Sequence, residues 1–272
     1  GARTVFVGSA KSVEVARYGP FEQRVLARAA ACFVRDDATA LDLRRRGLRV
    51  DVANAIVDLF PTTENGAAEW AVAGFAPALA LFPGSRTNAY DDAAFLLRVV
   101  GELATQHCGI GAVLSIARGL DSDRFAAQAG QAGWDVRTTT QESIPFVLSR
   151  GGREIVRGWR GPLGPLLARS VLVLGQAGTA NEAAAAAAVP VVAFQRDRNR
   201  RTCWYRERQR GLLGDALLVL PGDLTDAVAG VNEVLNDPAR RRLMGEVGRA
   251  RMGEAGAARR IAERIAALLG AS

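Results

Sequence analysis

Short apolar runs alternate along this chain with longer segments whose apolar positions recur at helical spacing. Runs rich in Val, Leu, Ile and Ala predict buried strands over residues 4–7, 31–34, 50–53, 78–82, 112–116, 134–138, 154–157, 171–174, 189–194 and 217–220. Helical patterns fall over residues 21–31, 37–46, 91–107, 123–133, 163–168, 180–188, 203–211, 224–236, 238–252 and 257–269. Strands that alternate with helices in this way predict βαβ units, and therefore an α/β fold with parallel, Rossmann-like sheets.

A polar stretch from Pro61 to Gly66 interrupts the series and predicts a linker between two domains. Residues 1–65 then form a partial first domain, residues 66–250 a complete second domain, and residues 251–272 a closing helix. The chain begins at Gly1 rather than Met, and its first strand follows within a few residues. We therefore expect it to be cut from a longer protein whose N-terminal domain is incomplete here.

Composition limits the classes of function. The chain has 272 residues, of which 49% are hydrophobic, which predicts a globular protein with no run long enough to span a membrane. Its net charge of +7 comes almost entirely from arginines spread along the sequence, which favours solvated helix faces, an anionic membrane surface or an acidic ligand over nucleic acid. The single histidine, His107, and three widely spaced cysteines argue against a Ser-His-Asp triad and a metal site, and the unpaired cysteines fit a reducing cytoplasm.

One candidate binding loop follows the predicted strand over residues 78–82. It reads Pro83-Gly84-Ser85-Arg86, so a tight turn presents an arginine directly after a buried strand. A guanidinium donates two parallel hydrogen bonds and is suited to a diphosphate. Loops at the carboxyl ends of parallel strands form the ligand crevice of such sheets, and we expect Arg86 to lie there.

A second candidate loop, Gly175 to Thr179, follows a strand and opens a helix. Unpaired backbone N–H groups and the positive end of the helix dipole favour a phosphate at Gly178 and Thr179. Glu182 has two interpretations, which stay open here. It completes a capping box with Thr179, or its carboxylate accepts hydrogen bonds from ribose hydroxyls.

The segment from Arg196 to Arg208 leaves the next strand at the same predicted edge of the sheet. With Asn199, Trp204 and Tyr205 it is placed to contact a sugar or an acceptor. A solvated amphipathic helix with one buried aromatic residue is the alternative.

Three segments together resemble a known family: Phe82-Pro83-Gly84-Ser85-Arg86, then 179–184, then 189–192. They are similar to the C-terminal domain of lipid-A-disaccharide synthase and its relatives, which are inverting glycosyltransferases of the GT-B fold. Residues 34–36, 39–40, 47 and 54–58 resemble the end of that family's N-terminal domain. The resemblance implies that the chain is a hexosyltransferase when full length, binding a UDP-sugar donor and transferring the sugar to a hydroxyl acceptor, which in the synthase is lipid-linked. It implies a cytoplasmic protein that contacts the inner face of the membrane peripherally, with no metal and no cofactor besides the donor.

Carried over by position, the resemblance places Gly84, Ser85, Arg86, Gly178 and Thr179 on the diphosphate. The resemblance also implies that Glu182 holds the ribose and that the last helix crosses back to the first domain. The catalytic base of the family lies in the half that this chain lacks, so no catalytic residue is named. A UDP-sugar 2-epimerase, which shares the two-domain plan, and a non-catalytic nucleotide-sugar-binding module are the alternatives.

Overall fold

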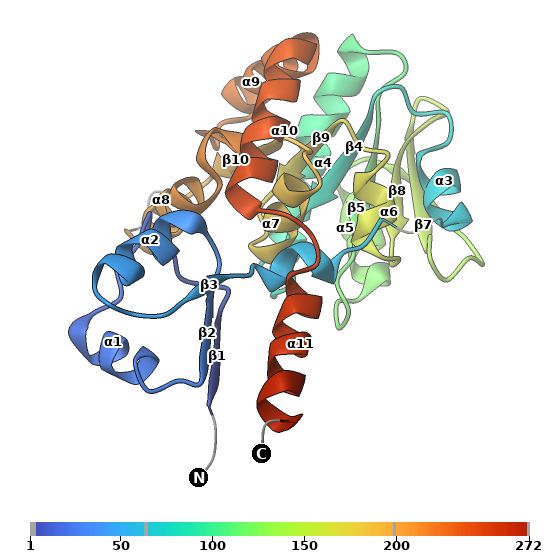
Figure 1. The fold of residues 1–272 in the computed structure, drawn as a ribbon. Helices are drawn as coiled ribbons and strands as arrows, with labels where there is room; N and C mark the ends of the chain where they lie inside the picture. Colours follow the sequence, from blue (N-terminus) through green and yellow to red (C-terminus); the bar gives the residue numbers. More distant parts are fainter. Residues whose placement is uncertain (1–3, 63–64, 198–199, 271–272) are drawn as a thin grey trace.

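The computed structural model describes residues 4–62, 65–197 and 200–270 of the chain. Two separate sheets with helices packed on their faces make up the molecule (Figure 1). All strand pairs are parallel except those made by β7, which joins one end of the larger sheet. This arrangement confirms the predicted α/β fold with parallel, Rossmann-like sheets.

The small sheet is covered on both faces. Its strands are β1 (Val5–Gly8), β2 (Ala31–Val34) and β3 (Asp51–Val52), in that order. Alternate residues of β2 point to opposite faces, as strand geometry requires. Cys32 packs under α1 (Pro20–Leu26) and α2 (Asp37–Arg45), whereas Phe33 contacts Ile261 of the last helix, α11 (Ala257–Gly270). The C-terminal helix therefore completes the core around the first sheet.

The larger sheet has the strand order β11-β10-β9-β4-β5-β8-β7-β6. Its strands are β4 (Ala78–Phe82), β5 (Gly111–Ser115), β6 (Asp135–Thr138), β7 (Phe146–Arg150), β8 (Arg153–Trp159), β9 (Leu172–Gly175), β10 (Val191–Gln195) and β11 (Leu217–Pro221). The chain passes from β4 to β5, continues to the far edge as β6, comes back through β7 and β8, and then forms β9 on the other side of β4. Strand order thus reverses between β4 and β9.

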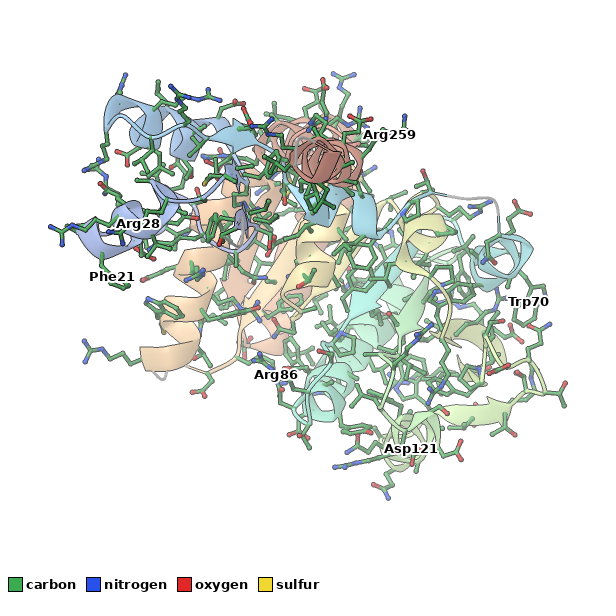
Figure 2. The ribbon with its side chains drawn as sticks, turned by 60° about the horizontal axis from the view of Figure 1, so that its bottom comes forward. Phe21, Arg28, Trp70, Arg86, Asp121 and Arg259 are labelled. Atoms are coloured by element: carbon green, nitrogen blue, oxygen red, sulfur yellow. The ribbon has the colours of Figure 1, made fainter. Side chains whose placement is uncertain are left out.

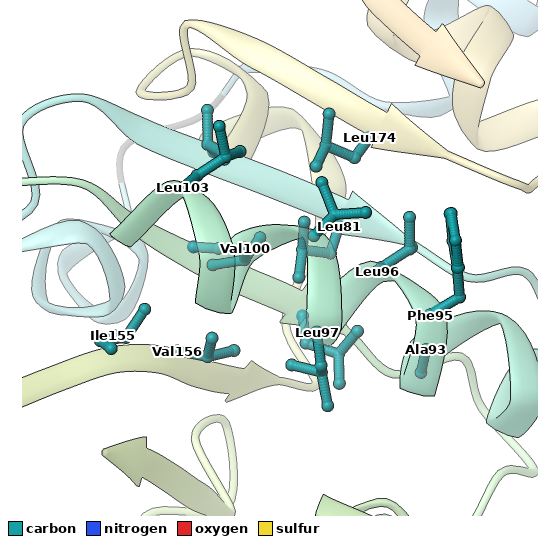
Figure 3. Close-up of a cluster of buried hydrophobic side chains, with 14 of the residues drawn as sticks. Leu81, Ala93, Phe95, Leu96, Leu97, Val100, Leu103, Ile155, Val156 and Leu174 are labelled. Carbon is teal, nitrogen blue, oxygen red and sulfur yellow. The ribbon is translucent and has the colours of Figure 1, made fainter. Parts of the chain in front are cut away.

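Helices cover both faces of this sheet (Figure 1). The helices are α3 (Gly66–Val72), α4 (Ala89–Gln106), α5 (Ser122–Gln131), α6 (Leu163–Leu167), α7 (Thr179–Ala186), α8 (Arg200–Leu213), α9 (Leu224–Asn236) and α10 (Pro238–Met252), with short 3-10 turns η1 (Ala55–Leu59) and η2 (Gly214–Ala216). Figure 3 shows the α4 side of the core, where Leu96 and Val100 lie against Leu81 of β4. Burying each such side chain contributes about 1.5–3 kcal/mol, which makes the edge of this sheet a rigid support for loops.

Two elements depart from the prediction. Strand β7 was not expected, although Gly151 and Gly152, both with positive φ, join it to β8 in a hairpin. Helix α3 was not expected, because the predicted linker ended at Gly66 and the residues after it were assigned to no element, but Asn65 starts the helix by accepting a hydrogen bond from the Ala68 amide at 3.1 Å. In the part of the chain that the structure describes, no helix combines the length and the apolar character needed to cross a membrane.

Candidate functional site

Strand order reverses between β4 and β9, and the space outside their carboxyl ends is where open α/β sheets bind ligands. Phe82 at the end of β4 pairs with Gly175 at the end of β9. The Phe82 carbonyl also accepts hydrogen bonds from the amides of Gln176, at 2.8 Å, and Ala177, at 3.1 Å. The two loops singled out in the sequence therefore leave neighbouring strands and contact each other.

The first loop is an exposed turn. Gly84 has a φ of +112°, a conformation that side chains with a Cβ rarely adopt, so glycine is required there. Ser85 and Arg86 are exposed, and the Arg86 carbonyl accepts the Ala89 amide at 2.8 Å as α4 begins. Figure 2 shows Arg86 beside this end of α4, on the far side of the view from Arg259 of α11. The guanidinium is thus free to meet a ligand at the crevice.

The second loop ends in the uncapped N-terminus of α7. Gly178 is the N-cap residue and makes no side-chain cap, so the capping box between Thr179 and Glu182 is not formed. The amides of Gln176 and Ala177 already donate to the Phe82 carbonyl. Within the described residues, no acceptor bonds the amides of Gly178, Thr179 and Ala180. Three orphan donors at the positive end of a helix are favourable partners for an anion.

Glu182 faces the first part of the chain. Its Oε2 lies 3.2 Å from Nη1 of Arg35, in the loop after β2, and the two side chains are 14% and 1% exposed. Burial raises the pKa of Glu182, and the charge of Arg35 opposes that rise. Arg35 also donates to the Ser9 carbonyl at 3.1 Å and contacts the sulfur of Met252. The sequence did not predict the pairing of Arg35 with Glu182, because the two residues are 147 positions apart.

The Oε1 atom of Glu182 makes no hydrogen bond to any described residue. One oxygen is therefore held by Arg35 while the other is available to a hydroxyl. This geometry is compatible with the predicted contact between Glu182 and a ribose. Glu182 itself lies where elements of the two sheets meet.

Helix α8 lies beside the second loop. The hydroxyl oxygen of Tyr205 lies 2.7 Å from the position that a Cβ on Gly178 would occupy. Burial raises the pKa of Tyr205, and the positive charges of Arg206, Arg86 and Arg208 oppose this rise. These three guanidiniums therefore all act on the Tyr205 hydroxyl, which lies beside Gly178. The part of the predicted segment that lies in α8, from Arg200 onward, does reach this edge, with Trp204 exposed, whereas Asn199 lies outside the described residues.

A further ion pair ties the start of α4 to the end of β10. Nη1 of Arg196 lies 2.6 Å from Oδ1 of Asp92 and donates to the Asp91 carbonyl at 3.0 Å. Burial raises the pKa of Asp92, and the hydrogen bond and charge of Arg196 counteract it. Among the described residues, no group of three or more His, Cys, Asp or Glu side chains is placed to hold a metal ion. The site is built from cations and amides around one partly free carboxylate.

Comparison with known proteins gives the fold but no family. No protein-family model and no curated protein sequence matches the chain. Similar solved structures include S. aureus MnaA with UDP, at 17% identity and a TM-score of 0.63, with 98% of this chain and 70% of that one covered. A UDP-GlcNAc 2-epimerase from Neisseria meningitidis bound to UDP-GlcNAc is 11% identical, with a TM-score of 0.58 and coverages of 97% and 69%. The UDP-GlcNAc 2-epimerase from Methanocaldococcus jannaschii is 16% identical, with a TM-score of 0.55 and coverages of 97% and 70%.

These neighbours are enzymes of the GT-B fold, and the chain has that architecture. At such low identity the likeness concerns the fold. The more specific resemblance to lipid-A-disaccharide synthase, which was drawn from the sequence, has no counterpart among the comparisons and stays a prediction.

Proposed function

We propose that this chain binds a UDP-sugar in the crevice between β4 and β9. The observation that supports this most is that the Arg86 loop and the orphan amides of Gly178, Thr179 and Ala180 follow two neighbouring strands at the point where strand order reverses. Arg86 and these amides bind the diphosphate from two sides. The free Oε1 of Glu182 accepts a hydrogen bond from the ribose, while Gly84 and Ser85 let the first loop approach the phosphates closely.

The chemistry that we propose is that of a UDP-sugar 2-epimerase, the alternative drawn from the sequence. The neighbours whose likeness extends over nearly the whole chain are described as UDP-GlcNAc 2-epimerases, which favours this class over the transferase. In an epimerisation that eliminates UDP, the C2 proton and the bond from C1 to UDP are lost as a C1=C2 double bond forms, and re-addition of UDP and of a proton to the other face inverts C2. In sugar transfer the acceptor oxygen bonds to C1 as the bond to UDP breaks. In both cases negative charge develops on the diphosphate. Preorganised donors at the helix terminus and on Arg86 stabilise that charge.

Sugar transfer to a hydroxyl acceptor remains the second candidate, supported by the three-segment resemblance described above. A lipid-linked acceptor, a peripheral position at the membrane and a cytoplasmic location belong to that candidate as predictions. A binding module without catalysis is the third.

Binding is tested by isothermal titration with UDP, UMP and ADP. We expect UDP to bind, and Arg86→Ala to weaken it roughly 10- to 100-fold, because a hydrogen bond to a charged group is worth about 1.5–3 kcal/mol. Arg259→Ala is the matched control, since it removes an exposed arginine of α11 on the far side of Figure 2. Equal UDP affinity in wild type and Arg86→Ala would refute the proposal.

The reaction class is tested by incubating the chain with UDP-N-acetylglucosamine and following the sugar by proton NMR. An epimerase produces the 2-epimer, or releases UDP, with no acceptor present. A transferase leaves the substrate intact until an acceptor is added. A protein that binds UDP but changes nothing under either condition is a binding module.

A further inference from the structure

We propose that Gln209, buried on α8, is a positioning residue that turns the Gly178 amide toward the diphosphate. This inference rests on the proposed UDP site and deepens it. Gln209 is only 4% exposed, so its side chain is not itself a surface for ligand. Its action is exerted through the peptide bond between Ala177 and Gly178.

A hydrogen bond to its carbonyl oxygen sets the orientation of that peptide. Nε2 of Gln209 donates to the Ala177 carbonyl oxygen at 2.8 Å. In a planar trans peptide the C=O and N–H bonds point in opposite directions. Because α8 holds the Ala177 oxygen, the Gly178 N–H must point away from α8. Were the peptide to turn over, a carbonyl oxygen would face the anion and repel it.

Arg206 fixes which end of the Gln209 amide faces the loop. Its Nη1 donates to Oε1 of Gln209 at 2.9 Å, and a guanidinium has no acceptor. Oε1 of Gln209 therefore faces Arg206, and Nε2 is left for the Ala177 carbonyl. Nη2 of Arg206 also donates to Oε1 of Gln176, in the loop itself.

Gln176 in turn anchors the loop to the sheet. Its Nε2 donates to the Phe194 carbonyl at 3.1 Å, and its Oε1 accepts the Phe194 amide at 3.3 Å. The chain of contacts runs from the end of β10 through Gln176 and Arg206 to Gln209, and then to the peptide that carries the Gly178 amide. The Tyr205 hydroxyl, also on α8, lies 2.7 Å from the position of a Cβ on Gly178 and limits the movement of Gly178 toward α8.

The test compares UDP binding by the wild type, Gln209→Leu and Gln209→Glu. Leucine keeps much of the volume but donates no hydrogen bond, and glutamate presents an acceptor to the carbonyl. We expect roughly tenfold weaker binding or more for leucine, and a larger loss for glutamate. Gln23→Leu is the matched control, because Nε2 of Gln23 donates to a backbone carbonyl, that of Tyr18, at 2.6 Å on α1.

A second readout separates positioning from general destabilisation. In ¹⁵N–¹H spectra, UDP should shift the Gly178 amide of the wild type strongly downfield, and this shift should be lost in Gln209→Leu at saturating UDP. If the leucine variant does not fold, Gln209→Asn, which keeps the donor on a shorter side chain, takes its place with the same expected outcomes.

The outcomes are distinct. Wild-type protein that binds no UDP overturns the proposed function and this inference together. Wild-type protein that binds UDP while Gln209→Leu binds it as tightly as Gln23→Leu overturns this inference alone.

Discussion

Replacing Arg35 with methionine would leave the carboxylate of Glu182 buried without its cation. The two charges lie 3.2 Å apart with side chains 1% and 14% exposed, so solvent screens them little. At an effective dielectric constant of about 20, their attraction is about 5 kcal/mol. Removing one member of a buried pair typically costs about 3–5 kcal/mol. We expect Arg35→Met to lower the free energy of unfolding by that amount at neutral pH.

The loss should depend on pH. Burial raises the pKa of Glu182 above its ordinary value of 4.5, and Arg35 opposes this rise, so the pKa climbs further in the variant. A carboxyl group whose pKa is higher in the folded state binds its proton more tightly there. The stability that it contributes is complete below the unfolded pKa and is lost as pH rises through the folded pKa. Arg35→Met should therefore be closest to wild type near pH 4.5 and furthest from it near pH 8.

Urea denaturation followed by circular dichroism from pH 4.5 to pH 8 measures this difference. The double variant Arg35→Met/Glu182→Gln is the control, because it carries no titrating carboxyl at this position and should lose the added pH dependence. A deficit for Arg35→Met that is the same at every pH, or smaller than about 0.5 kcal/mol throughout, would contradict the buried ion pair.

Three further predictions follow from contacts elsewhere. Asp58→Ala should lower the free energy of unfolding in urea by about 1–2 kcal/mol, because the Asp58 carboxylate caps the start of α11. It accepts hydrogen bonds from the amides of Gly256 at 2.6 Å and Ala258 at 2.7 Å, and unchanged stability would argue against this cap. Lys11 lowers the pKa of Glu22 through a hydrogen bond of 2.6 Å, with help from a backbone amide. In Lys11→Met an NMR titration should find that pKa closer to 4.5, and an unchanged value would contradict the pairing. Gly175→Ala should cost about 1–3 kcal/mol in thermal unfolding, because the new Cβ would fall on the Asn181 amide oxygen, and a neutral result would show that this side chain yields freely.

The periodic elements were predictable because each depends on local pattern. Every strand expected from an apolar run corresponds to a strand of the structure, with ends shifted by a few residues. Strand β7 was not predicted because Phe146–Arg150 follows a polar loop and mixes apolar with polar residues. Only Gly151 and Gly152 indicated a hairpin there. Helix α3 escaped because its Ala-rich sequence continues directly from a polar stretch.

The site was predictable only as far as single loops. The strand-then-glycine pattern located Gly84 and Gly178, and parallel topology brought both to one edge. The partner of Glu182 could not be predicted from the sequence, because the contact with Arg35 depends on how the two sheets pack. Gln209 gave no signal either, since a glutamine on a polar helix looks like a surface residue until α8 is placed against the loop.

The path of α11 has a practical consequence for anyone who wishes to cut this protein into pieces. Its Ala257 and Ile261 pack against Ala31 and Phe33, so the last helix of the chain is an integral wall of the first hydrophobic core. A protease nick at the exposed Pro61 would sever the polypeptide without separating the fragments, and the nicked molecule should still elute from a sizing column as a single particle. Expression of either fragment alone should give protein that aggregates.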